Sequence, residues 1–339
     1  MKTFLHILSI LLLTAFFFPT AAAEESPKPI KILYIAGAGS HEYGGHEHNA
    51  GAIFLADYLR RYVSGQPIYP DGKTAPKLEI TICHDARPGD TFPWEDADVV
   101  VIHSDGDGAY PLAGHEESLI RLREKGVGFV FLHYSLCGTL RFPAADTDFI
   151  RDTLGGVYET HHSVNPFYTA EFPAIPDHPI TRGVRPFTLY DEWYFHMRFA
   201  DGLTTEDILA ETSDEIRAIL VTIPPDAEKL GPDGAHSGNP AVRARLGLPE
   251  IVAWAAERED GGRGFGFTGL DVHWNFAHPD FRKILLQAIL WSARVDIPPR
   301  GIDTPSPTFE TLQENLDEEN PLTPEQEAEI RARIEAWNL

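Results

Sequence analysis

The chain has 339 residues, too many for a small module, and its length allows one large domain or two. Hydrophobic residues make up 43% of it and charged residues 23%, which indicates a globular rather than a disordered protein. The formal net charge of −23 disfavours binding to nucleic acid or anionic lipid, and it fits a neutral or cationic small-molecule partner.

Residues 1–23 have the pattern of a secretory signal peptide. Met1 and Lys2 form a short basic start, residues 4–18 are mostly apolar, and the alanines at 21–23 offer a small-residue cleavage site. The apolar run is shorter than the roughly 20 residues that a membrane-spanning helix needs. We therefore expect a cleaved leader, export to the periplasm or the extracellular space, and no stable membrane insertion after cleavage.

Apolar segments that predict strands alternate with segments at helical spacing through the first half of the chain. The predicted strands cover 30–36, 78–83, 98–103 and 127–133, and the predicted helices cover 49–62 and 116–124. This alternation indicates parallel strands joined by right-handed crossovers. Because the strands are continuously apolar, we expect them to be buried on both faces of the sheet.

The second half is less regular. Prolines interrupt residues 140–250, where we expect extra strands and long loops that build over the sheet. Regular structure returns with strand-like segments at 251–257 and 264–269 and with an amphipathic helix at 279–292. Residues 303–339 form an acidic tail, whose last part predicts either a terminal helix packed on the body or a mobile segment.

The two cysteines, Cys83 and Cys137, lie in one predicted strand and just after another. An exported protein could pair them, but a single pair cannot be assigned from sequence. We expect two unpaired thiols.

Histidines follow several predicted strands at the point where each strand ends. In an open parallel sheet, ligands bind outside the carboxyl ends of the strands. The residues at these ends are His41, His46 and His48 after the first strand, His103 and Asp105 after the third, His133 and Tyr134 at the fourth, and His273 and Trp274 after the late strand. We therefore expect a histidine-rich pocket at this edge of the sheet.

Two further segments are expected to join this pocket. One carries His161, and the other, at 191–198, carries Asp191, Glu192, Trp193, His196 and Arg198. Carboxylates suit general base work or sugar hydroxyls, aromatic rings offer flat faces to sugar rings, and histidine can move protons. Singly, these residues also have structural interpretations, since the tryptophans fit a core and Asp105 fits a turn. The cluster as a whole favours function.

A metal site is left open by the same residues. The candidate ligands are His41, His46, His133 and His273, because three imidazoles with an open position suit a catalytic divalent metal such as zinc. The chain has no HExxH or similarly close metal-binding spacing. The sequence therefore predicts no certain cofactor, and a bound divalent metal is left as an alternative.

Several longer motifs stand out along the chain. They include AGAGSHEYGGHEHNAG, KGVGFVFLHYS, GGVYETHHSVNP, DEWYFHMRF and GRGFGFTGLDVHWNFAHPDFRKILLQAILW. Over about residues 30–302 the sequence resembles the ThuA-like (trehalose-utilisation-type) family of the class I glutamine amidotransferase-like superfamily. The resemblance implies one domain at 28–302 with a flavodoxin-like α/β fold: an open parallel sheet, helices on both faces, and a loop-rich elaboration in the middle.

The glutaminase reaction of that superfamily needs a cysteine at a strand-to-helix elbow, activated by a histidine. In this chain His133 and Tyr134 stand at the matching elbow, whereas Cys137 comes several residues late and lacks the glycine frame. The resemblance therefore implies the fold without amidotransferase activity.

Together, the pocket and the resemblance predict a carbohydrate-active enzyme that acts on a sugar or keto-sugar derivative by acid/base proton transfer, giving isomerisation or cleavage. His133 and His273 are the expected acid and base, and Asp191 or Glu192 would orient them or bind hydroxyls. The expected substrate-binding residues are His41, His46, His48, Asp105, Tyr134, His161, Trp193, His196, Arg198 and Trp274. A non-catalytic sugar-binding protein and a metal-dependent hydrolase are the alternatives. The expected partner is a small carbohydrate, and a homo-oligomer is left open.

Overall fold

The structure is a computed structural model that describes residues 28–137, 141–142 and 147–338. The predicted signal peptide at 1–23 lies outside the described residues. Within the described ranges, no helix has the length and apolar character needed to cross a membrane.

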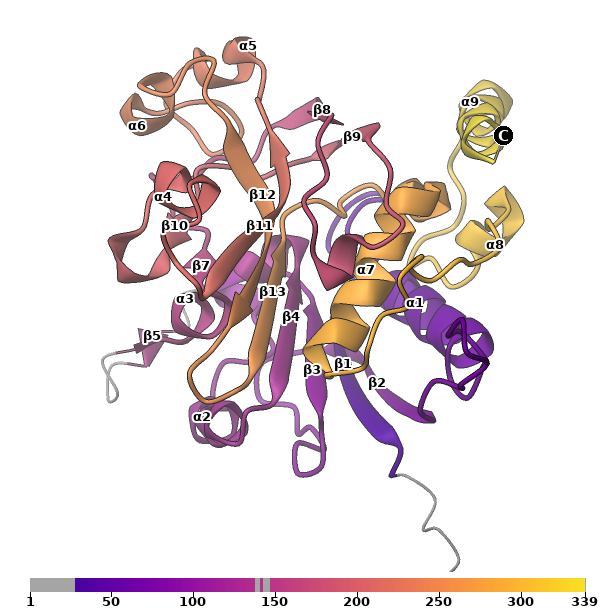
Figure 1. The fold of residues 1–339 in the computed structure, drawn as a ribbon. Helices are drawn as coiled ribbons and strands as arrows, with labels where there is room; N and C mark the ends of the chain where they lie inside the picture. The colour runs from indigo at the N-terminus through magenta and orange to yellow at the C-terminus, as the bar shows by residue number, and fades with distance from the viewer. Residues whose placement is uncertain (1–27, 138–140, 143–146, 339) are drawn as a thin grey trace, which may run out of the picture.

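A seven-stranded sheet forms the centre of the fold (Figure 1). Its strands are β1 (Ile30–Gly37), β2 (Leu78–Ala86), β3 (Val99–His103), β4 (Gly128–Leu132), β11 (Ile216–Thr222), β12 (Glu250–Glu257) and β13 (Arg263–Phe267). They are ordered β2-β1-β3-β4-β13-β12-β11 across the sheet. Every residue of β3 and β4 is buried, as the continuously apolar sequence predicts.

The first five strands in this order run parallel. Their order is that of a flavodoxin-like sheet, and the predicted α/β fold is confirmed. β12 is antiparallel to both β13 and β11. Its orientation follows from the short connection at 258–262, because a tight turn joins antiparallel strands whereas parallel strands need a long crossover.

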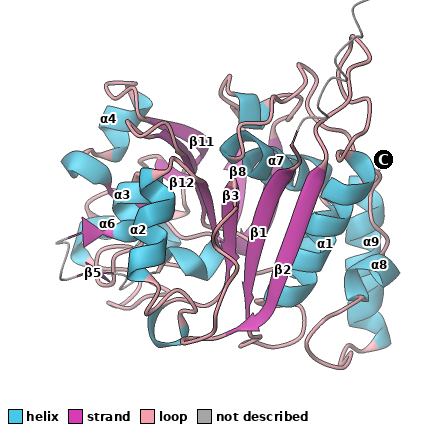
Figure 2. Ribbon diagram, turned by 90° about the horizontal axis from the view of Figure 1, so that it is seen from below, coloured by secondary structure: helices cyan, strands magenta, loops and turns pink. Residues whose placement is uncertain are grey.

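Helices cover both faces of the sheet (Figure 2). On one face, α1 (His48–Tyr62) and α7 (Pro279–Ser292) bury their apolar residues in a core that includes Tyr34, Val101 and Phe267. On the other face, α2 (Glu116–Glu124) and α3 (Phe149–Leu154) pack in a second core. The three predicted helices at 49–62, 116–124 and 279–292 therefore form within a residue of their expected bounds.

The expected elaboration of residues 140–250 consists of short elements between β4 and β12. Its strands are β5 (Arg141–Phe142), β6 (Thr147–Asp148), β7 (Gly156–Val157), β8 (Phe167–Phe172), β9 (Phe187–Glu192) and β10 (Arg198–Phe199). Its further helices are α4 (Thr205–Leu209), α5 (Asp226–Lys229) and α6 (Pro240–Arg243). β8 and β9 form an antiparallel hairpin that brings Glu192 to the carboxyl edge of the main sheet.

The tail at 303–339 packs on the body. Its helices are α8 (Phe309–Gln313) and α9 (Pro324–Trp337), and Phe309, Leu312 and Ile334 are buried. Phe309 stacks on Trp274 with ring centroids 5.1 Å apart. Of the two alternatives, the terminal helix packed on the body is the one observed.

The register of the parallel strands places their ends side by side. Ala36 of β1 pairs with His103 of β3, His103 with Leu132 of β4, and Leu132 with Phe267 of β13. The segments that follow these residues therefore emerge together at one edge of the sheet. Cys83 and Cys137 form no disulfide, as expected.

Candidate functional site

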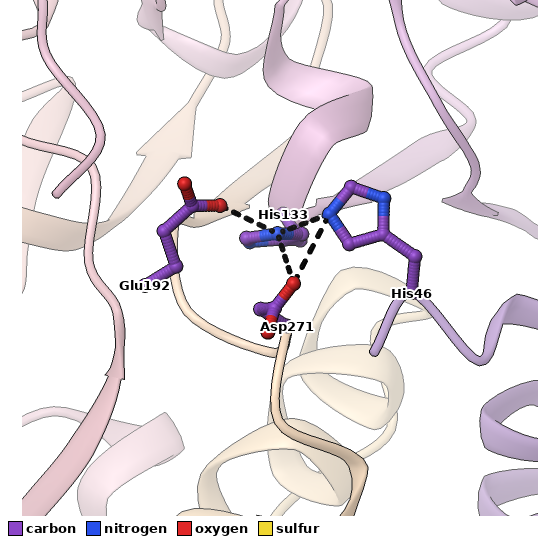
Figure 3. Close-up of side chains that lie close together, drawn as sticks. All are labelled: His46, His133, Glu192 and Asp271. Carbon is purple, nitrogen blue, oxygen red and sulfur yellow. Dashed lines mark hydrogen bonds and ion pairs between the residues drawn. The ribbon is translucent and has the colours of Figure 1, made fainter. Parts of the chain in front are cut away.

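Four side chains from four separate segments meet at this edge (Figure 3). His46 lies in the loop between β1 and α1, and His133 begins the short 3₁₀ turn η2 (His133–Leu136) after β4. Glu192 ends β9, and Asp271 lies between β13 and the 3₁₀ turn η5 (His273–Ala277). We call these four residues the edge cluster; their side chains are between 0 and 11% exposed.

The two imidazoles of the edge cluster face each other through their Nε2 atoms, which are 3.0 Å apart. On the far side of His133, Nδ1 lies 2.8 Å from the carbonyl oxygen of Thr268, which can only accept a hydrogen bond. On the far side of His46, Nδ1 lies 2.9 Å from Oδ1 of Asp105. Both Nδ1 atoms therefore carry protons, and in the neutral tautomers both Nε2 lone pairs point into the cluster.

The two carboxylates complete the edge cluster. Oδ1 of Asp271 is 3.3 Å from Nε2 of His46 and 3.9 Å from Nε2 of His133. Oε2 of Glu192 is 3.4 Å from Nε2 of His133. The Tyr194 hydroxyl approaches the same nitrogen to 3.2 Å.

Asp191 holds the segments that carry both acids. Its carboxylate accepts hydrogen bonds from the backbone N–H groups of residues 270, 271 and 272, and from the side chain of Asn275. It also accepts the N–H of Glu192, at 2.9 Å. Asp191 is fully buried and bonds the backbone of Asp271 and Glu192 rather than their carboxylates, so its role is to position them.

Left-handed backbone conformations occur at this site. His46 has a φ of 47°, His133 of 56°, and Leu270, next to Asp271, of 97°. Such conformations cost about 1–3 kcal/mol each in residues other than glycine, and they cluster at functional sites. The surrounding packing therefore holds these side chains in place against local backbone preference.

Burial and close charges shift the pKa values of the edge cluster. Burial lowers the pKa of His46 to about 4 and raises that of Asp271 to about 7. For His133, burial lowers the pKa, but the hydrogen bond and charge of Glu192 and the charge of Asp271 outweigh it, and the net pKa is raised to about 9. Protonation therefore places a positive charge on His133, between the carboxylates.

A cavity of about 260 Å³ adjoins the edge cluster. Its lining is polar and aromatic and consists of His41, His46, Asp107, Tyr134, Cys137, Tyr158, Thr160, Asn165, Glu192, Tyr194, Ala235 and His236. A neighbouring cavity of about 460 Å³ shares Tyr158, Thr160 and Ala235 with it. His46 and Glu192 are thus members of the edge cluster that also form the wall of an accessible space.

Several residues predicted from sequence do meet here. His41, His46, Tyr134 and Glu192 line the cavity, and His133 contacts His46 without lining it. Asp105 holds His46, and His48, buried at the start of α1, lies 3.7 Å from Asp105 and bonds the carbonyl of Ala38.

Other predicted residues lie elsewhere. The Nε2 of His273 bonds the carbonyl oxygen of Leu312, and Trp274 packs between Tyr43 and Phe309, so neither joins the edge cluster. Trp193 is fully buried against Phe172 and Phe267.

Three more predicted residues sit beside the elaboration rather than in the edge cluster. His161 lines the neighbouring cavity. His196 stacks on His162 with centroids 4.1 Å apart, and Arg198 forms an ion pair with Glu159 at 2.9 Å.

Asp271 and several cavity residues were not singled out from sequence. Asp271 follows a predicted strand and lies two positions before His273. The signal that the sequence offers for this residue is therefore an acidic side chain at the end of a strand. Its inward direction depends on the N–H groups of 270–272 bonding Asp191, which sequence does not reveal. Asn165, Tyr194 and His236 come from the elaboration, whose path no periodicity predicts.

Two sets of side chains in the described part of the chain are arranged so that they could hold a metal ion. The first is the edge cluster, whose four ligand atoms lie within 4.8 Å of one another. The second is formed by His41, His46 and Asp105, of which His41 is exposed. The sets share His46, whose Nε2 faces the edge cluster and whose Nδ1 faces Asp105.

Solved structures of ThuA-like proteins resemble this chain at low identity. One from Bacteroides uniformis shows 15% identity and a TM-score of 0.48, covering 81% of this chain and 95% of its own. One from Parabacteroides merdae shows the same identity and TM-score, covering 86% and 100%. The structure of PurLQS from Thermotoga maritima shows 9% identity and a TM-score of 0.37, covering 78% and 98%.

No curated protein matches the chain. The model of the ThuA family, described as trehalose utilisation, matches residues 77–292. This range includes His133, Glu192 and Asp271 of the edge cluster and begins after His46. Because the match spans more than half of the 339 residues, the chain belongs to the ThuA family.

Proposed function

We propose that this protein is a carbohydrate-active enzyme that moves a proton on a sugar or keto-sugar derivative, leading to isomerisation or elimination-type cleavage. The observation that carries the proposal is that His46 and Glu192 belong both to a buried acid–base cluster and to a cavity wall. Buried titratable groups with shifted pKa values that border a cavity are typical of catalytic sites.

The cavity lining supports a sugar as the substrate. Tyr134, Tyr158 and Tyr194 offer aromatic rings, while Asp107 and Asn165 offer groups that can bond hydroxyls. The neighbouring cavity gives room for a second sugar unit. The description of the family as trehalose utilisation, a disaccharide pathway by its wording, agrees with this chemistry.

Within this proposal, the Glu192 carboxylate at the cavity wall takes a proton from the substrate, and the imidazoles at the same wall pass that proton on. His41 and His236 line the cavity and are solvent-exposed. His236 Nδ1 lies 3.2 Å from Oε1 of Glu192, whose other oxygen faces His133. Glu192 therefore connects a solvent-exposed imidazole to the buried one.

A metal-dependent hydrolase is the second candidate. It is favoured by the convergence of two imidazoles and two carboxylates on one point, an arrangement that can activate a water molecule when a metal is bound. Both candidates use the same cavity and differ in whether water is consumed.

Turnover of a panel of keto-disaccharides by the wild-type protein and by two variants tests the proposal. We expect His236→Gln and Glu192→Gln to lower kcat by about 10²–10⁴-fold, the range for loss of a general acid or base. His84→Gln is the matched control, because His84 is exposed on β2 and does not line the cavity.

Full activity in both variants contradicts the proposal. Saturable sugar binding by calorimetry without any turnover would instead indicate a non-catalytic sugar-binding protein. Products whose summed mass exceeds that of the substrate by one water would favour the hydrolase.

A further inference from the structure

We infer that the edge cluster, His46, His133, Glu192 and Asp271, is a binding site for one divalent first-row transition-metal ion. The inference depends on the geometry of these four side chains alone. It does not depend on the proton-transfer function proposed above, and it supplies the metal that the second candidate, a hydrolase, requires.

The first observation is the direction of the two histidines. The Nδ1–H of His133 donates to a backbone carbonyl, and the Nδ1–H of His46 donates to Asp105. With these bonds made, two Nε2 lone pairs face each other at 3.0 Å in a buried space. Two buried acceptors in contact are unfavourable unless a positive charge lies between them. The Nε2 proton of His133 supplies that charge when no metal is bound, and a metal ion would supply it in the proton's place.

The carboxylates point to the same place. Oδ1 of Asp271 and Oε2 of Glu192 add two more electron-rich atoms at 3.3 and 3.4 Å from the imidazole nitrogens. No lysine or arginine side chain makes an ion pair with either acid among the described residues. The space between the four atoms therefore favours a cation.

The separations suit metal ligands. Zinc bonds of about 2.0–2.2 Å place neighbouring ligand atoms of a tetrahedral site about 3.3–3.6 Å apart. Separations of 3.0, 3.3 and 3.4 Å lie close to this range, a fourth is 3.9 Å, and all four atoms fall within 4.8 Å of one another. Binding an ion would require only small side-chain adjustments.

The surrounding contacts are those of a metal site. Metal-bound histidines donate their other ring N–H to a carboxylate or a backbone carbonyl, which fixes the ring and its tautomer. His46 does this with Asp105, and His133 does it with the carbonyl of Thr268. The left-handed backbone at both histidines shows that these directions are imposed by the fold.

The donor set selects the class of metal. Imidazole nitrogen suits zinc, iron, nickel and copper, whereas Mg²⁺ and Ca²⁺ prefer oxygen ligands throughout. Because His46 and Glu192 border the cavity, the ion would be accessible from that side, where it could polarise a substrate oxygen.

Titration of chelator-treated, purified protein with Zn²⁺, and with Co²⁺ as a spectroscopic probe, tests the inference. We expect one ion per chain by calorimetry and Co²⁺ d–d absorption in the visible region. Asp271→Asn and Glu192→Gln should each weaken affinity by about 100-fold or more, because each removes a charged ligand. Thermal unfolding of the metal-free variants checks that each one folds.

His41→Ala is the discriminating control. It removes only the second set, His41, His46 and Asp105, and leaves the edge cluster complete. Affinity within about threefold of wild type supports the edge cluster. The inference is overturned if His41→Ala weakens metal affinity as much as Asp271→Asn does, or more. It is also overturned if the wild-type protein binds no metal.

Failure of the inference and failure of the proposed function give different results. If the protein binds the metal but turns over no sugar, the proposed metal site stands and the proposed function is wrong. Full sugar turnover by wild-type protein that binds neither Zn²⁺ nor Co²⁺ in the titration retains the function and removes the site.

Discussion

At the scale of single residues, Asp191 shows how a buried carboxylate organises the edge cluster through the backbone of its members. It accepts five hydrogen bonds described above, from the N–H groups of Glu192 and residues 270–272 and from Asn275. Burial raises its pKa, whereas these bonds act in the opposite direction. The residue thus links β9 to the segment after β13.

Replacement of Asp191 by alanine should destabilise the protein. Each buried N–H left without an acceptor costs about 1–3 kcal/mol, so we expect Asp191→Ala to lower the free energy of unfolding by about 3 kcal/mol or more. Denaturant unfolding measures this effect. The control is Asp177→Ala, at an exposed position, for which a change within about 0.5 kcal/mol is expected. Equal effects would contradict the role assigned to Asp191.

The sequence identifies the candidate residues by their type and their position in the chain, but it does not show which way their side chains point. The sequence predicts His46, His133 and Glu192 as site residues, because they follow strands or lie in a polar motif. Asp271 and His273 are equivalent by that criterion, yet only Asp271 enters the edge cluster, while His273 bonds Leu312. The difference arises from hydrogen bonds to Asp191, which is about 80 residues distant in sequence.

At the scale of elements, the helix α7 begins at a histidine cap. The ring of His278 accepts the N–H of Phe281 at 3.4 Å and is largely buried. Burial lowers its pKa from about 6.5 to about 4. Below pH 6.5 the unfolded chain therefore takes up a proton that the folded protein resists, and stability falls as the pH approaches 4.

His278→Asn isolates this contribution, because asparagine also caps helices but does not titrate. We expect the stability advantage of the wild type over the variant to decrease by up to about 3 kcal/mol between pH 7.5 and pH 4, the size implied by the pKa shift. Urea unfolding at several pH values measures it. Parallel pH profiles for the two proteins would show that His278 contributes nothing.

At the scale of the whole molecule, the tail at 303–339 supports the loop that carries His46. The N–H of Asp317 donates to Oε2 of Glu47, Gln313 donates to the hydroxyl of Tyr43, and Phe309 stacks on Trp274. The other oxygen of Glu47 accepts the N–H of Gly44. Contacts across about 270 residues thus hold this loop against η5.

Phe309→Ala should therefore loosen the loop as well as destabilise the fold. Loss of a buried phenylalanine costs about 3–5 kcal/mol. We expect faster hydrogen exchange at residues 40–47 and little change at β11, measured by mass spectrometry. Phe167→Ala, at a position 42% exposed, is the control. Uniform acceleration in both regions would contradict a local supporting role.

The sequence by itself determined the fold class and the edge of the sheet at which the edge cluster lies. Continuous apolar strands, helical spacing and strand-end histidines are local patterns, and each follows from neighbouring residues. The register that aligns Ala36, His103, Leu132 and Phe267 confirms the shared edge.

Tertiary structure alone decided which side chains face one another. The pairing of His46 with His133, the entry of Glu192 from a hairpin and the inward turn of Asp271 depend on contacts between residues far apart in the chain. Such contacts form only when the sheet, the elaboration and the tail pack together. No local pattern encodes them, because each segment satisfies its own periodicity in either orientation.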